Sequence, residues 1–374
     1  MTVAVVGTGT IGSMVLWRLA ERGISAVGFD TYAPGHDRGA AGGESRIFRM
    51  AYREGPEYVP LLAQARNMWL DLERHAPGQL FYPSGFVTVG DPSHPDIVTS
   101  LETARVHDLD VEILDASEAS RRVPEHPVRD GETMVFDPQG GLLLPERSVL
   151  TAALRAEQLG AEIRRYRRII DVIDEGDRAT VVTTDGPESF DQVIVACGPW
   201  VADLDVVRHL PLQPKELVAT WFPRRSTDRF VLGRTPTALR VGTPGFSCFP
   251  AVDGTGVKVI AHGAYSEIDG PELLPRSAPE AVVRRASEFA AAVLPDLHPD
   301  PIRVGTYSDA YTPDHHPFLG RAAQGSPIIH ASGFSGHGFK LAPMFGDLIA
   351  DIVADDRPRI DIAFMDPSRF AAAA

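Results

Sequence analysis

The stretch Thr2-Val-Ala-Val-Val-Gly-Thr-Gly-Thr-Ile-Gly12 decides the fold of this chain. Its apolar half is typical of a short, fully buried parallel strand, and a G-x-G-x-x-G turn made by Gly7, Gly9 and Gly12 follows at once. A helical pattern comes next, and then a second short strand that ends in Asp30. Strand, glycine turn, helix and strand with an acidic end predict a βαβ unit that binds a dinucleotide.

Each part of this unit has a physical task. The first glycine permits the tight turn, the second lets the backbone approach a pyrophosphate, and the third lets the helix pack on the strand. Thr10 and Ile11 lie where the helix begins, and free N–H groups and the positive end of the helix dipole favour phosphate there. Asp30 is expected to accept hydrogen bonds from the adenosine ribose. The motif by itself fits NAD as well as FAD.

The rest of the chain predicts an α/β protein of two interleaved domains. Helices are expected over 56–75, 116–122, 146–161, 278–294 and 343–355. The apolar strand over 191–196 returns the chain to the dinucleotide domain, whereas 211–262 alternates in the manner of an antiparallel sheet. One domain would therefore bind the dinucleotide with pieces from the start, middle and end of the chain. The other would be a mostly antiparallel sheet built from the two intervening stretches.

Composition argues against several classes of protein. The 374 residues suffice for two domains of about 150 residues each. A formal net charge of −14 disfavours nucleic acids and anionic membranes as partners. No apolar run approaches the ~20 residues of a membrane span, and no basic segment precedes the first strand as it would in a signal peptide. Two cysteines, Cys197 and Cys248, make no disulfide framework, so a cytoplasmic protein is expected.

Lysine is rare in this chain, which has three lysines beside 33 arginines. Lysine is a compact charge whose pKa shifts readily, and arginine does not replace it in that capacity. Each of Lys215, Lys258 and Lys340 is therefore a candidate functional residue.

Two further motifs carry little weight. Asp314-His315-His316 places two histidines side by side, which does not point to one metal ion, and we predict no metal site. The segment 333–336 reads G-F-S-G, one residue short of the G-x-S-x-G turn of a serine hydrolase.

Five segments together resemble the sarcosine oxidase and N-methyltryptophan oxidase family of FAD-dependent amine oxidases, within the D-amino-acid-oxidase-like superfamily. They are GTGTIG (7–12), ESRIFRMAYREGPEYVPL (44–61), FDPQGGLLLPE (136–146), GVKVIAH (256–262) and SGFSGHGFK (332–340). The resemblance covers nearly the full length and implies a glutathione-reductase-like Rossmann FAD domain interleaved with a substrate domain. The FAD domain would comprise 1–80, 145–210 and 302–374, and the substrate domain 81–144 and 211–301.

The resemblance also implies an activity. The family oxidises a secondary or N-methylated amino-acid-like amine by hydride transfer to flavin N5, the imine is hydrolysed, and O2 is reduced to H2O2. The implied protein is a monomer whose partners are a small amine or amino-acid substrate and O2. Three alternatives stay open: a dehydrogenase that passes electrons to a carrier or quinone, an oxidase of a primary or cyclic amino acid in a biosynthetic pathway, and a flavoprotein without catalysis.

Four basic residues receive roles from the resemblance. Arg49 and Lys340 match positions at which the family binds a substrate carboxylate, a task suited to fixed cations. Arg46 matches an arginine beside the flavin ring. Lys258 matches the family's oxygen-activating lysine. A buried cation suits that role because it stabilises the superoxide that forms first. Lys215 matches no family position and is expected at the surface.

The other expected site residues follow from the same segments. His262 and His337 match histidines near the family's active site, where each could orient the substrate or tune its protonation. Further contacts to FAD are expected from Ser45, Gly198, Gly336, Gly338 and Lys340.

Three departures from the family change the expected pocket. The cysteine that carries FAD covalently in the family is Tyr307 here, so FAD should bind non-covalently. Two active-site tyrosines become Ser247 and Asp309, and a histidine of the early loop becomes Gly42. A larger or more polar substrate is therefore expected, with a cationic group facing Asp309.

Overall fold

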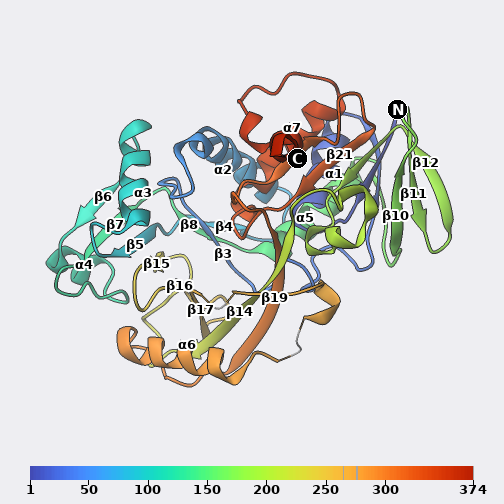
Figure 1. The fold of residues 1–374 in the computed structure, drawn as a ribbon. Helices are drawn as coiled ribbons and strands as arrows, with labels where there is room; N and C mark the ends of the chain where they lie inside the picture. The colour runs from blue at the N-terminus through green and yellow to red at the C-terminus, as the bar shows by residue number, and fades with distance from the viewer. Residues whose placement is uncertain (264, 275–276, 374) are drawn as a thin grey trace.

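A six-stranded sheet forms around the N-terminal unit in the order β20-β21-β13-β1-β2-β9. The structure is a computed structural model and describes residues 1–263, 265–274 and 277–373 (Figure 1). The strands of this sheet are β1 (Thr2–Val6), β2 (Ser25–Phe29), β9 (Glu162–Arg164), β13 (Gln192–Val195), β20 (Phe318–Arg321) and β21 (Ile328–Ser332). Every pair is parallel except β20 with β21, so pieces from the start, middle and end of the chain meet in one sheet.

Helices pack beside this sheet and share one apolar core. They are α1 (Thr10–Glu21), α2 (Val59–Glu73), α5 (Pro145–Gln158) and α7 (Ala342–Val353). Helix α1 packs against both α5 and α7, and its buried Trp17 and Leu19 belong to the same core as Leu348 of α7. The approach of α7 is close because Gly346 has no side chain: a Cβ there would lie 2.7 Å from the backbone of Met14.

A second, nine-stranded sheet has the order β18-β14-β17-β16-β15-β5-β7-β6, with β19 also paired to β14. Its strands are β5 (Phe86–Gly90), β6 (Glu112–Leu114), β7 (Thr133–Asp137), β14 (Gln213–Pro223), β15 (Thr237–Arg240), β16 (Phe246–Phe249), β17 (Gly256–Ala261), β18 (Tyr265–Glu267) and β19 (Arg303–Tyr311). The pairs are antiparallel except β15 with β5. Side chains of α6 (Glu280–Val293) share an apolar core with those of β14, β16 and β17.

Two small sheets complete the fold. One contains β3 (Arg46–Phe48), β8 (Gly141–Leu143) and β4 (Phe81–Tyr82), in the order β3-β8-β4. The other contains β10 (Ile169–Asp174), β11 (Ala179–Thr183) and β12 (Gly186–Phe190). In Figure 1 it lies at the opposite end of the molecule from α3 (Pro95–Val106) and α4 (Ala116–Arg122). Within the described ranges, no helix is long and apolar enough to cross a membrane.

The expected fold class is confirmed: parallel strands around the glycine turn and a mostly antiparallel second sheet make a mixed α/β protein. Helix α4 (Ala116–Arg122) lies where expected, but α3 (Pro95–Val106) was not expected. It buries Ile97, Ser100, Thr103 and Ala104, so half of its buried positions are polar and its apolar stripe is narrow. The division into domains remains a prediction, and β19, which it assigns to the FAD domain, pairs with β14 in the second sheet.

Candidate active site

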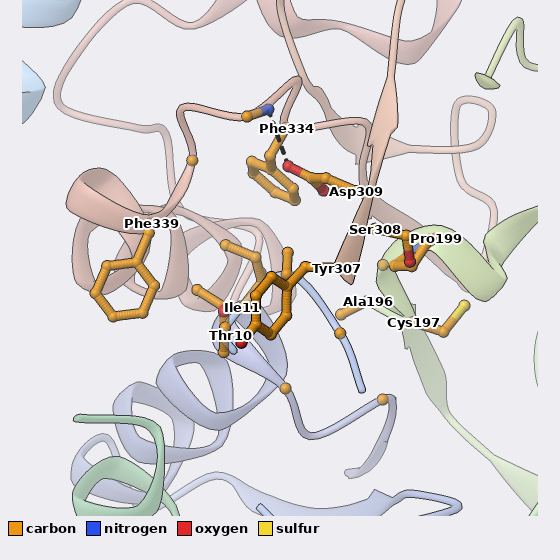
Figure 2. Close-up of a pocket in the computed structure, with 18 of the residues that line it drawn as sticks. Thr10, Ile11, Ala196, Cys197, Pro199, Tyr307, Ser308, Asp309, Phe334 and Phe339 are labelled. Atoms are coloured by element: carbon orange, nitrogen blue, oxygen red, sulfur yellow. Dashed lines mark hydrogen bonds between the residues drawn. The ribbon is translucent and has the colours of Figure 1, made fainter. Parts of the chain in front are cut away.

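One cavity of about 1060 Å³ connects the glycine turn with the second sheet. At one end it is lined by the turn after β1, and at the other by side chains of the second sheet and of the segment that follows β21. Among the predicted residues, the lining includes Gly7, Gly9, Thr10, Ile11, Asp30, Arg46, Arg49, Gly198, His262, Asp309, Gly336, His337, Gly338 and Lys340. Sequence segments far apart in the chain therefore meet around a single space, part of which Figure 2 shows.

The three glycines of the turn differ in what surrounds them. Gly7 has φ +91°, and a Cβ there would lie 2.6 Å from the carbonyl oxygen of Ala196. At Gly12 a Cβ would lie 1.7 Å from the carbonyl oxygen of Gly7, so this glycine is required for packing and does not line the cavity. A Cβ at Gly9 would meet nothing within 4 Å, because this glycine faces the cavity. The turn thus leaves its backbone open to a pyrophosphate, and the residues fit a dinucleotide.

Asp30 is held at the cavity edge by its own neighbours. Its Oδ2 accepts hydrogen bonds from Thr8 N (2.7 Å) and Thr8 Oγ1 (3.0 Å), and its Oδ1 accepts one from Tyr32 N (2.8 Å). The carboxylate lines the cavity at the end of β2, as a ribose acceptor must.

Ser45, at the end of the loop before β3, and Arg46, the first residue of β3, are two of the residues expected at the flavin. Arg46 lines the cavity and donates to the carbonyl oxygens of Ser45 (2.7 Å), Ala40 (2.5 Å) and Gly42 (2.5 Å). Burial lowers the pKa of its guanidinium. Ser45 does not line the cavity, although its Oγ is buried and has no hydrogen-bond partner. Gly198, Gly336 and Gly338, by contrast, all line the cavity.

Arg49 and Lys340 meet at the same end of the cavity. Nη2 of Arg49 donates to both carboxylate oxygens of Glu54, at 2.6 and 2.7 Å, while its buried Nε has no partner. Lys340 Nζ donates to the carbonyl oxygen of His337 (3.1 Å) and to Tyr52 Oη (3.5 Å). Burial lowers the pKa of Lys340 to about 7. Burial also raises the pKa of Glu54, but Arg49 and Arg53 outweigh it and hold that pKa well below its ordinary value.

The two predicted histidines have different surroundings. His337 Nε2 lies 2.8 Å from the carbonyl oxygen of His315, which only accepts, so Nε2 carries the proton and Nδ1 accepts from Tyr52 Oη at 2.8 Å. Both nitrogens of His337 are therefore engaged within the protein. His262 lines the cavity and its Nε2 lies 3.2 Å from Ser247 Oγ. Burial lowers the pKa of both histidines to about 4, so both are neutral at pH 7.

Lys258 is buried behind the cavity wall. Its Nζ donates to the carbonyl oxygens of Gly43 (2.7 Å) and Ser45 (2.5 Å) and lies 4.0 Å from the ring centre of Phe249. Burial lowers its pKa well below the ordinary value. Lys258 is not among the residues that line the cavity, and the carbonyl oxygen of Ser45 that it binds also accepts a hydrogen bond from Arg46.

Tyr307 and Asp309 project from β19 toward the cavity (Figure 2). The ring of Tyr307 packs where glycines leave room: a Cβ at Gly42 would lie 2.4 Å from it and one at Gly305 2.7 Å from its hydroxyl oxygen. Asp309 Oδ2 accepts from Gly336 N and its Oδ1 from Ala310 N, both at 2.9 Å. Burial raises the pKa of Asp309 to about 6.

Several lining residues were missed or misplaced by sequence reasoning. Lys215 was expected at the surface, and its side chain is partly exposed, but it also lines the cavity. Its Nζ lies 3.7 Å from Glu267 and 5.1 Å from the ring centre of Tyr311. The scarcity of lysine was the signal that could have found it. Glu54 lines the cavity, and Tyr52 lies behind it and bonds to His337. Both belong to the segment 44–61 that resembles the family, but no role was assigned to either.

Comparison with known proteins agrees with this site. The family model described as FAD dependent oxidoreductase matches residues 2–352. Monomeric sarcosine oxidase of Streptomyces avermitilis is 31% identical over 99% of this chain and 98% of its own length. N-methyl-L-tryptophan oxidase of Citrobacter koseri is 28% identical over 98% of each chain.

Solved structures show the same fold. NikD, an amino acid oxidase essential for nikkomycin biosynthesis, has a TM-score of 0.86 at 22% identity, over 98% of this chain and 96% of its own. L-proline dehydrogenase from P. horikoshii has a TM-score of 0.86 at 19% identity, over 100% and 98% of the two chains. The resemblance stated from the sequence is thus confirmed, and the chain belongs to the FAD-dependent oxidoreductase family.

Proposed function

We propose that this protein is an FAD-dependent oxidase of amino-acid-like amines, secondary or N-methylated. The observation that carries the proposal is that one cavity joins the dinucleotide turn to a pair of buried cations, Arg49 and Lys340. When bound, FAD supplies a two-electron acceptor for the C–H bond beside the amine. The chain's own residues then have to bind the substrate carboxylate, orient the amine and exclude water.

The cation pair is suited to a carboxylate ligand. Both residues are more than nine-tenths buried. Only one nitrogen of Arg49, Nη2, binds the carboxylate of Glu54. Its orphaned Nε and the weakly bonded Nζ of Lys340 offer further donors to an incoming carboxylate. An amino acid is therefore favoured over a simple amine.

FAD is proposed to bind without a covalent link. The position that carries the flavin in the family holds Tyr307, whose ring packs against Gly42 and Gly305. A tyrosine of raised pKa is a poor nucleophile, and burial raises the pKa of this one. Neither cysteine stands at that position: Cys248 is buried outside the lining, and Cys197 lines the cavity after β13.

Oxygen is the proposed electron acceptor, giving H2O2, in a cytoplasmic monomer. The support is Lys258, a buried cation bonded to the loop that holds Arg46 at the cavity wall. Lys258 lies outside the lining, however, and this favours as a second candidate a dehydrogenase that passes electrons to a carrier or quinone.

The test starts from the visible spectrum of the purified protein, repeated on the supernatant after acid precipitation. Yellow flavin in the supernatant is the expected result, whereas flavin in the pellet would contradict non-covalent binding. A colourless protein that binds no added FAD would contradict the proposed function. Peroxide formed during turnover of an amine, measured against consumption of a quinone, then separates the oxidase from the dehydrogenase.

A further inference from the structure

Asp309 is a partly buried carboxylate that lines the cavity and has no cation as an ion-pair partner among the described residues. Its two oxygens each accept one hydrogen bond, both from backbone N–H groups, those of Ala310 and Gly336. Each carboxylate oxygen has about two lone-pair sites, so half of its acceptor capacity is unused. Within the described parts of the chain, no ion pair joins it to a lysine, arginine or histidine.

The strand register places a cation beside Asp309, but that cation points elsewhere. Lys215 of β14 lies directly opposite Asp309 of β19, a position from which cross-strand ion pairs usually form. Lys215 Nζ instead lies 3.7 Å from Glu267 and over the ring of Tyr311. The carboxylate is thus left to a partner that comes from the cavity.

The other cations around the cavity are engaged as well. Arg46, the one charge that acts on Asp309 appreciably, donates to three backbone carbonyls. Lys340 bonds to His337 and Tyr52, and Arg49 bonds to Glu54. A buried carboxylate without a compensating charge is unfavourable, so a cationic group on the ligand would complete the site.

An amino-acid substrate brings such a group. It enters as a zwitterion, but its nitrogen needs a free lone pair before a C=N bond forms. Resting on the proposed function, we propose that Asp309 binds the substrate's ammonium group and accepts one proton from it. The N–H bond breaks, an O–H bond forms on Asp309, and the substrate nitrogen gains a free lone pair. That lone pair would become the second C–N bond when bound FAD, the two-electron acceptor, took the hydride from the neighbouring C–H bond. The product is an iminium ion, so charge and electrons balance.

The other titratable groups at this end are less suited to this role. His337 has both nitrogens engaged, and His262 has a pKa of about 4, too low to hold a proton at pH 7. Asp309 has a pKa raised by burial to about 6, close to the working pH that favours a general base. Arg46 from β3 is the one charge that acts on Asp309. The other titratable side chains that line the cavity with it on the neighbouring elements are Lys215 from β14, Tyr311 from β19, and His337 and Lys340 after β21.

The test compares ligands that differ only at the amine, using FAD-loaded protein. Sarcosine is paired with methoxyacetate, and L-proline with (S)-tetrahydrofuran-2-carboxylate, which have an ether oxygen in place of the amine. Binding is followed by perturbation of the flavin spectrum under anaerobic conditions, and reduction by stopped flow. The wild type is expected to bind at least one amino acid tenfold or more tightly than its ether at pH 7.5.

Asp309→Asn is expected to abolish that preference and to leave ether binding within about twofold. It should slow flavin reduction by at least about 100-fold, the usual lower bound for loss of a general base. The wild-type reduction rate should fall below pH 6, and Asp309→Glu should restore part of the rate together with this acid limb. Asp205→Asn, the same change at an exposed aspartate paired with Arg208, is the control and should match the wild type.

The outcomes separate the two proposals. If neither ethers nor amino acids perturb or reduce the flavin, the proposed function itself is wrong. If the wild type binds the ethers as tightly as the amino acids, or if Asp309→Asn keeps FAD and reduces at the wild-type rate with the same acid limb, the role of Asp309 is wrong.

Discussion

The two ends of the cavity are shaped by different means. At the dinucleotide end the backbone shapes the cavity. Gly7, Gly9 and Gly12 lie within one short turn, and at Gly7 and Gly12 a Cβ would have no room. At the substrate end, buried side-chain charges do it, and Arg49, Asp309 and Lys340 come from distant segments. At the first end Gly7 and Gly12 leave no room for a Cβ, and at the second end we expect charge to matter more than shape.

The largest effect is expected at Gly12. A Cβ 1.7 Å from the carbonyl oxygen of Gly7 forces the helix off the strand, so Gly12→Ala should lower the free energy of unfolding by at least about 3 kcal/mol. Gly9→Ala is the matched control, since its Cβ meets no protein atom within 4 Å. It should keep the melting temperature within a few degrees and weaken FAD binding instead. Thermal melts and FAD titrations of both variants check this, and equal loss of stability would contradict the distinct roles of the two glycines.

Lys258 lies behind the cavity wall and belongs to neither end. Its removal tests whether a positive charge there speeds oxygen reduction. Lys258→Met should slow reoxidation of the reduced flavin by oxygen roughly 100-fold, while flavin reduction by substrate changes little. Separate stopped-flow measurements of the two half-reactions check this. Equal losses in both would remove its assigned role in oxygen reduction. Lys215→Met replaces another lysine of the cavity region and should leave reoxidation unchanged.

At the substrate end, Arg49→Ala should weaken binding of methoxyacetate about 30-fold, equivalent to about 2 kcal/mol for a hydrogen bond between charged groups. The FAD content should stay as in the wild type, because Arg49 bonds to Glu54 and not to the dinucleotide turn. Arg105→Ala, which breaks an exposed pair with Glu102, serves as the control for loss of an arginine. Unchanged affinity for the carboxylate in Arg49→Ala would refute the cation pair.

The smallest expected effect is a pH dependence from Lys340. Its pKa is lowered by burial to about 7, so the ammonium is charged below that pH and neutral above it. Affinity for methoxyacetate should therefore fall as pH rises from 7 to 8.5, by up to about tenfold. Lys340→Met should bind more weakly at pH 7 and show a flat profile. A wild-type profile that is also flat would mean that Lys340 stays charged or does not touch the carboxylate.

The same contrast explains what could be predicted from the sequence. The glycine turn and Asp30 are local, because one βαβ unit contains every residue needed, and the pattern indicated both the fold and the dinucleotide. The segments around Arg49 and Lys340 were identified through resemblance to a family. The residues of such a site come together only in the folded protein, so their spacing in one sequence does not reveal them.

The side-chain partners of those residues could not be predicted from the sequence. Nothing in the sequence indicates that Glu54 pairs with Arg49, or that β14 and β19 align Lys215 with Asp309. Strand register depends on pairing between segments roughly ninety positions apart, and a shift by one residue would turn Lys215 to the other face. The scarcity of lysine marks Lys215 as a candidate, but its alignment with Asp309 follows only from the fold.

The most direct test of the central claim is anaerobic mixing of the FAD-loaded protein with amino acids and with the same amines lacking a carboxylate. Sarcosine is compared with dimethylamine, and L-proline with pyrrolidine, by the loss of visible flavin absorbance. The account predicts that an amino acid bleaches the flavin and that its carboxylate-free counterpart does so at least tenfold more slowly. Equal bleaching by both members of each pair, or bleaching by none of the four, would contradict it.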